Sequence, residues 1–263
     1  MDTRFRAAGA ADIPATVSER LKFRVPPAFF ELPVHQAPEL VGEELIELAQ
    51  DIYPSGNAEL WFQYAAAQLP VVAEMMEAGV GYAGFCLLDL DGRHSTATVT
   101  ATLLESVPDG RKVTASSIAA ELSGTGDERD RTQVETVWLA AGEAAARFTS
   151  EIMTLPAEIT DSGRSEEVEI GKIAVFLPLR RHAEMALFEL STPCMEDWDL
   201  YSELFFTIVN TLEIADAEPS ADDAPAHQPQ PQWPTSAAPT TQADVAHDVE
   251  VPPQPKPVRN VFG

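Results

Sequence analysis

The sequence has few cysteines and no long apolar run. Its two cysteines, Cys86 and Cys194, lie in apolar stretches and form no CxxC or Cys/His cluster. This usage favours reduced thiols in a cytoplasmic protein over a disulfide. No apolar run reaches the roughly 18 residues that a membrane-spanning helix requires. No apolar segment follows Arg4 and Arg6, as it would in a signal peptide. The sequence therefore predicts a cytoplasmic protein without membrane insertion.

Positive charge is also scarce. The chain has 17 Lys and Arg against 42 Asp and Glu, which gives a formal net charge of −25. A field of this sign repels phosphate backbones and anionic lipid head groups. Nucleic acid and anionic membranes are therefore excluded as primary partners. Electrostatics would favour a basic protein partner, but acidity is also simply a route to solubility, and solubility is the preferred interpretation.

Catalytic motifs are missing as well. The chain has no G-x-S-x-G, P-loop, dinucleotide-binding or H-E-x-x-H signature. Its histidines are scattered and predict no metal site: His35, His94, His182, His227 and His247. Cys194 follows Pro193 at the expected start of a helix, where a thiolate is stabilised, but no histidine lies near it in sequence. The sequence predicts a non-enzyme without cofactors, with a hydrolase or redox protein using Cys194 as a minor alternative.

The N-terminal part predicts a leader, an arm and two helices. Residues 1–22 are small and polar without a strong period, which predicts a flexible leader. Three prolines in residues 23–34 exclude a central strand and favour an edge strand or extended arm. Apolar spacing then predicts helices over residues 38–52 and 58–78.

One face of the second predicted helix carries aromatic and methionine side chains. The most prominent of these are Trp61, Tyr64, Met75 and Met76. Such a stripe is typical of core packing. It is also the site that a small apolar ligand or lipid would use if a pocket lies between the helices and the sheet.

The apolar period changes to two after residue 80. It predicts three hairpins, with strands at 81–90 and 95–105, 132–140 and 144–153, and 168–177 and 184–190. Asp91-Gly92 is a strong turn signal in the first hairpin. A short helix is predicted over residues 113–122, and a last helix follows a cap at Thr192. The last helix has one apolar face, formed by Trp198, Tyr201, Phe205, Ile208, Val209 and Leu212.

This order of elements predicts an α/β (α+β) domain over residues 23–214. Both faces of the predicted sheet are apolar in part, so both need cover. The expected architecture is an α/β/α sandwich around an antiparallel sheet of about six strands.

The composition shifts sharply after the last helix. Residues 215–251 are rich in Pro, Ala, Asp and Gln and predict a disordered acidic linker. Residues 252–263 carry the only basic residues of the tail, together with a small apolar cluster. This composition predicts a docking motif tethered to the domain. Its candidate partner-binding residues are Val258, Arg259, Asn260, Val261 and Phe262.

The end of the predicted domain resembles the PsbP-like superfamily. A strand pair leads into LSTP at residues 190–193 and then into EDWDLYSELFFTIVNTL at residues 196–212. The superfamily includes photosystem II extrinsic subunits, a Ran-binding nuclear transport factor and actinobacterial LpqN-type proteins. The resemblance implies a binding scaffold without catalytic residues, and it assigns no site residue here. The two helices before the first hairpin depart from that pattern.

Together these features predict a non-catalytic adaptor that binds protein partners. The domain would bind one component of a multiprotein system, such as a secretion apparatus or a proteinaceous compartment, and the terminal peptide another. The alternative is a small-ligand or lipid-binding module. The sequence carries no signal for an oligomeric state.

Overall fold

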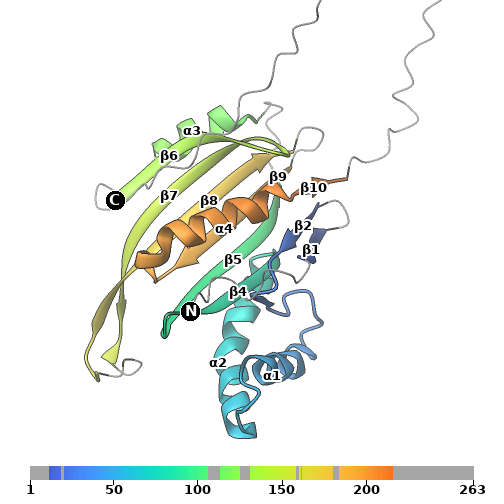
Figure 1. Ribbon diagram of the computed structural model, residues 1–263. Coiled ribbons are helices and arrows are strands. Elements are labelled where there is room, and N and C mark those ends of the chain that lie inside the picture. The colour runs from blue at the N-terminus through green and yellow to red at the C-terminus, as the bar shows by residue number, and fades with distance from the viewer. Residues whose placement is uncertain are drawn as a thin grey trace, which may run out of the picture.

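A computed structural model describes residues 12–18, 21–105, 113–124, 131–157, 160, 162–179 and 184–215. These residues form four α-helices, one large antiparallel sheet and one small sheet (Figure 1). The seven strands of the large sheet, in spatial order, are β3 (Phe29–Glu31), β4 (Val80–Leu90), β5 (Arg93–Glu105), β9 (Glu184–Thr192), β8 (Glu166–Pro178), β7 (Gly142–Leu155) and β6 (Arg131–Leu139). The small sheet contains β1 (Ile13–Ser18), β2 (Leu21–Val25) and β10 (Glu213–Ile214), with β2 in the middle.

The helices are α1 (Val41–Ile52), α2 (Ala58–Glu77), α3 (Ala115–Ser123) and α4 (Trp198–Asn210). A single 3₁₀ turn, η2 (Met195–Asp197), leads into α4. Thr114 caps α3, because its side chain accepts a hydrogen bond from the N–H of Ser117 and the side chain of Ser117 caps the N–H of Thr114 in return.

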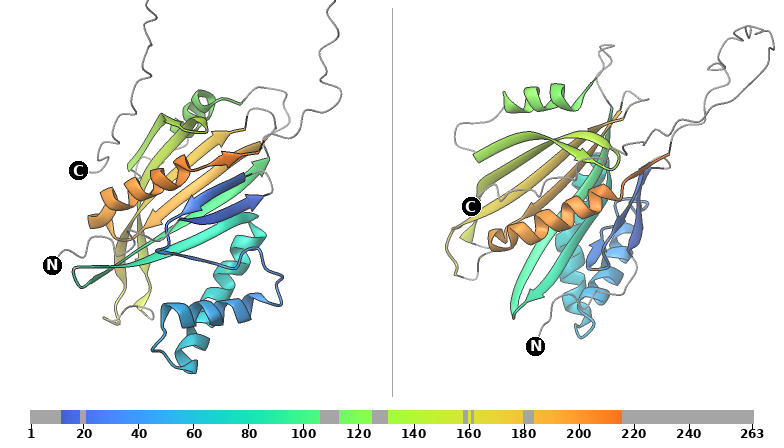
Figure 2. Two further views of the ribbon diagram at one scale, coloured as in Figure 1. Left: turned by 45° about the vertical axis from the view of Figure 1, so that its right-hand side comes forward. Right: turned by 45° about the horizontal axis from the view of Figure 1, so that its top comes forward.

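One face of the large sheet is covered by α4 and by the small sheet, which lie next to each other (Figure 2). This layer encloses the main core. Its largest fully buried side chains include Phe23, Tyr82, Phe148, Phe188, Tyr201 and Phe205. The main chain of β8 approaches the start of α4 closely at Gly171. A Cβ atom there would lie 2.5 Å from the indole of Trp198, so glycine is required for this contact.

The opposite face is covered at its two ends only. Helices α1 and α2 pack beside β3 and β4, where Ala83 points away from the main core. Helix α3 contacts β6 and β7 at the other end and buries Ala115 and Ile118. Between them this face carries polar side chains, such as Thr100 of β5 paired with Glu189 of β9, together with the exposed Leu87 of β4.

The predicted α+β class and antiparallel sheet are confirmed, and two details of the architecture fit only roughly. The large sheet has seven strands instead of about six, because the arm predicted at 23–34 contributes β3 as an edge strand. The sandwich is also incomplete, since a second sheet shares one face with α4. The Asp91-Gly92 turn is as expected, with φ of 57° and 83° at the two residues.

The domain begins earlier than residue 23. Strand β1 lies inside the segment predicted to be a leader and pairs with β2, and Leu21 is buried in the main core. Strand β1 is short and contains Pro14, so it has no clear period of its own. The end at residue 214 coincides with β10. The predicted linker and docking motif lie outside the described residues, apart from Ala215.

Candidate functional site

The helical pair α1–α2 extends beyond the β3–β4 end of the large sheet (Figures 1 and 2). Asn57 caps the N-terminus of helix α2, because its side chain accepts a hydrogen bond from the N–H of Leu60 at 2.9 Å. One side of α2 packs into a second, smaller core. The buried members of this core are Leu32, Val34, Val41, Leu45, Ala65, Val72 and Ala83.

The four residues predicted as a ligand pocket lie on this inner side of α2, near its two ends. Trp61 donates from Nε1 to the carbonyl oxygen of Tyr53 at 3.0 Å. Burial, and secondly the neighbouring Tyr53, raises the pKa of Tyr64 to about 12. Met75 and Met76 pack against the second core. At about 1.5 Å per residue, Trp61 and Met75 are about 21 Å apart along the helix, so the structure forms two pairs and does not gather all four residues.

Next to its packed side, α2 carries a second apolar stripe that no described element covers. Its members recur at i, i+4, i+7 and i+11: Phe62, Ala66, Leu69 and Ala73. All four are exposed, and the side chains of Phe62 and Leu69 are 62% and 44% exposed. We call these four residues the outer face of α2. An amphipathic surface helix normally turns polar side chains to solvent, so a second apolar stripe indicates a binding surface.

The surroundings of the outer face carry negative charge only. Glu59 and Glu77 stand at the two ends of the stripe and Glu74 lies beside it, all exposed. None of the three forms an ion pair with any described residue. No Lys or Arg occurs in residues 25–92, which contain eleven Asp and Glu. A partner for this face must therefore supply apolar side chains together with positive charge.

Pro70 lies in the middle of the outer face region. Proline has no N–H, so the carbonyl oxygen of Ala66 cannot accept the helical bond that residue 70 would normally donate. Ala66 is exposed, and its carbonyl oxygen is an acceptor for a donor from outside the helix.

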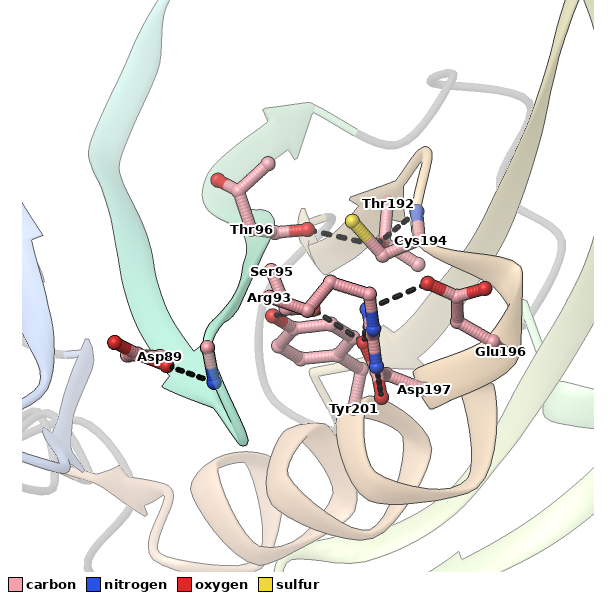
Figure 3. A network of polar contacts seen from close by, with 10 residues as sticks. Asp89, Arg93, Ser95, Thr96, Thr192, Cys194, Glu196, Asp197 and Tyr201 are labelled. Carbon is pink, nitrogen blue, oxygen red and sulfur yellow. Dashed lines mark hydrogen bonds and ion pairs between the residues drawn. The ribbon is translucent and has the colours of Figure 1, made fainter.

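A network of polar contacts lies elsewhere, where the β4–β5 hairpin meets the start of α4 (Figure 3). The guanidinium of Arg93 donates to both carboxylate oxygens of Asp197, at 2.8 and 2.7 Å, and pairs with Glu196 at 2.6 Å. Ser95 donates to Asp197 at 2.5 Å and accepts from the hydroxyl of Tyr201 at 2.8 Å. The hydrogen bond from Arg93 is the main reason why the pKa of Asp197 is lowered.

The chemistry of this network is that of a structural clamp. Ser95 is 1% exposed, so a substrate cannot reach its hydroxyl from solvent. Its neighbours are a carboxylate with a lowered pKa and a tyrosine whose pKa is raised, first by burial. Neither group is a base matched to neutral pH that could activate a serine. The network joins the first hairpin to α4 across about 100 residues of sequence.

Both cysteines are free and lie near this network. Cys86 is fully buried, and burial raises the pKa of its thiol to about 11. Cys194 is half-buried, and its N–H donates to the hydroxyl of Thr192 at 3.0 Å. Thr192 therefore ends β9 and does not cap α4, which begins six residues later at Trp198. The predicted N-cap of the last helix was wrong for this reason.

The predicted docking residues Val258, Arg259, Asn260, Val261 and Phe262 lie outside the described residues. In the described ranges, no group of three or more His, Cys, Asp and Glu side chains could hold a metal ion. None of the described helices is long and apolar enough to cross a membrane.

The outer face of α2 was not recognised in the sequence, although a signal for it was present. The inner stripe alone is sufficient to predict the helix, and the adjoining Phe62 and Leu69 stripe adds apolar residues beyond those that the core needs. The clamp between Arg93 and Asp197 had no sequence signal, because nothing local relates residues 104 positions apart. Comparison of the chain with protein-family models, with curated proteins and with solved structures finds no match.

Proposed function

We propose that this protein is a non-catalytic adaptor whose domain binds a protein partner through the outer face of α2. The observation that carries the proposal is the exposure of Phe62 and Leu69 on a helix that already packs an adjoining side into the domain. Contiguous exposed apolar surface of this kind is typical of protein interaction sites. Aromatic side chains such as Phe62 are enriched in such sites.

The chemistry of the partner follows from the charge around this face. A partner segment with apolar side chains and Lys or Arg would be attracted by Glu59, Glu74 and Glu77. Residues 25–92 contain no Lys or Arg that would repel it. Charge complementarity of this type increases association rates and selects among partners. A nucleic acid or an anionic membrane would be repelled at the same surface.

The reactive side chains also support a binding role. Ser95, Tyr201 and Asp197 are engaged with one another in the clamp. The resemblance to the PsbP-like superfamily, which implies a binding scaffold, points in the same direction.

The experiment is affinity capture from the native cell after mild cross-linking, with three forms of the full-length protein. These are the wild type, the double variant Phe62→Gln/Leu69→Gln, and the control Trp138→Gln. Trp138 is 73% exposed on β6, away from α2, and therefore controls for loss of an exposed apolar side chain. Urea unfolding of each variant verifies that the fold is retained.

A partner captured by the wild type and the control, and reduced at least tenfold with the double variant, supports the proposal. Equal recovery of every partner with all three forms contradicts it, because the outer face of α2 would then contribute nothing to binding.

A further inference from the structure

The outer face of α2 requires an occupant with a specific composition. The stripe offers Phe62 and Leu69 as apolar contacts and carboxylates at both ends. The carbonyl oxygen of Ala66, which receives no N–H from Pro70, adds an acceptor in the middle. The best-matched occupant is a short segment with two or three apolar side chains, at least one cation and no acidic residue.

This chain contains such a segment. After Arg181 the only Lys and Arg are Lys256 and Arg259. Residues 252–263 contain no Asp or Glu, and the apolar side chains of Val258, Val261 and Phe262 stand close to the two cations. Residues 216–251, in contrast, contain seven Asp and Glu and no Lys or Arg. The acidic stretch would be repelled by α2, and the terminal segment would be attracted.

We propose that residues 256–262 bind the outer face of α2 in the same molecule and cover it until a protein partner displaces them. The proposal rests on the proposed function, since it names the regulation of that binding face. Lys256 and Arg259 would pair with Glu59, Glu74 or Glu77. The apolar side chains would cover Phe62 and Leu69.

The length of the chain permits this contact. Residues 216–256 are 41 residues long; a fully flexible coil of that length has an end-to-end distance of about 35 Å, and proline and like charges extend a linker further. A domain of about 200 residues has a radius of gyration of about 17 Å. The segment therefore reaches the far side of the domain without being stretched. Tethering at this length gives an effective concentration on the order of millimolar, so even a weak contact is substantially occupied.

The arrangement makes two binding events exclude each other. While residues 256–262 lie on α2, neither that face nor the segment is available to another protein. A partner that binds the outer face releases the segment, which can then bind elsewhere. By thermodynamic linkage, a protein that binds the segment also uncovers α2, and the two partners assist each other.

Zero-length carbodiimide cross-linking of the full-length protein tests this directly, because it joins lysine amines to carboxylates in contact. The chain has only four lysines, Lys22, Lys112, Lys172 and Lys256, so the products are readily assigned by peptide mass mapping. We expect Lys256 to be joined mainly to Glu59, Glu74 or Glu77. The control Lys256→Arg keeps the charge, lacks the amine and should lose these products.

The double variant Phe62→Gln/Leu69→Gln should reduce the Lys256–α2 products at least fivefold, and Trp138→Gln should leave them unchanged. A 1:1 mixture of isotopically light and heavy protein separates contacts within one molecule from contacts between two. Products spread over carboxylates of other elements, equal yields in the double variant, or products found only between light and heavy chains would each overturn the proposal.

The outcome is separable from that of the partner-capture experiment. If capture depends on Phe62 and Leu69 while Lys256 shows no preference for α2, the adaptor function stands and the intramolecular contact fails. If the cross-link depends on Phe62 and Leu69 while capture does not, the intramolecular contact stands and the adaptor function fails. When both stand, the full-length variant Lys256→Glu/Arg259→Glu should recover several-fold more of the partner that binds α2.

Discussion

The hydroxyl of Tyr201 donates a hydrogen bond of 2.8 Å to the hydroxyl of Ser95, which lies 106 residues earlier in the chain. Both side chains are buried, so this bond joins α4 to the first hairpin inside the main core. Replacement Tyr201→Phe keeps the ring and removes the donor. We expect a loss of about 1 kcal/mol in the free energy of unfolding, measured by urea denaturation. Tyr53→Phe, at an exposed tyrosine, is the control and should change it by less than about 0.5 kcal/mol.

Asp197 should make the stability dependent on pH in the acid range. Its pKa is lowered in the folded state, chiefly by the hydrogen bond from Arg93. The carboxylate therefore stabilises the fold above its unfolded pKa of about 3.9, and this contribution is lost as the pH falls through the lower folded value. At pH 7 we expect Asp197→Asn to cost about 1–2 kcal/mol. When urea unfolding is measured from pH 7 to pH 3, the difference in the free energy of unfolding between wild type and variant should become smaller below pH 4. A difference that stays constant would contradict this account.

Gly171 should not tolerate a side chain. An added Cβ would lie 2.5 Å from the ring of Trp198 and 2.7 Å from the sulfur of Met195. Gly171→Ala should therefore lower the free energy of unfolding by about 1–3 kcal/mol. Gly42 in the first turn of α1 provides the matched control, because nothing lies within 4 Å of its added Cβ. Gly42→Ala should be neutral or stabilise by up to about 1 kcal/mol.

The two sides of the α1–α2 pair should respond differently to the same substitution. Leu45 is 0% exposed in the second core, whereas Leu69 is 44% exposed on the outer face of α2. Leu45→Ala should cost about 2–5 kcal/mol in the free energy of unfolding. Leu69→Ala should change it by less than about 0.5 kcal/mol. A large loss at Leu69 would show that the outer face is part of the core.

The two thiols should differ in reactivity. Cys86 is fully buried and its pKa is raised to about 11, whereas Cys194 is half-buried. At pH 8 a chromogenic disulfide reagent should label Cys194 of the native protein quickly. Cys86 should react at least a hundredfold more slowly until urea unfolds the protein. Cys194→Ser should remove the fast phase; a fast phase that survives would place Cys86 in contact with solvent.

Local patterns in the sequence predicted much of the fold. The apolar periods of α2 and α4 and the alternation of β5 are properties of neighbouring residues, so they are visible without the fold. Strand β1 was not predicted, because Pro14 and small residues give it no apolar period. Only its pairing with β2 makes it a strand. The clamp between Arg93 and Asp197 could not be predicted from local patterns, because it depends on the packing of α4 against β5.

The helix that carries the candidate site was predicted, but its exposed apolar stripe was not. The side of α2 that carries Trp61 and Tyr64 was identified as apolar, and the structure places it inward, where packing is sufficient to explain it. The exposure of Phe62 and Leu69 could not be predicted, because it depends on which face of α2 the rest of the domain covers. A helix that is apolar on two sides cannot be assigned an exposed face from its sequence alone.

The small sheet joins the beginning of the domain to its end, since β10 pairs with β2. During synthesis, β1 and β2 leave the ribosome before the other described strands, but Leu21 and Phe23 receive no cover from α4 or β10 until about 190 residues later. At about 5–20 residues per second this interval is on the order of 10–40 s. In the nascent chain the apolar side chains of β1 and β2 therefore lack this cover throughout the interval, which is when a chaperone would be most needed.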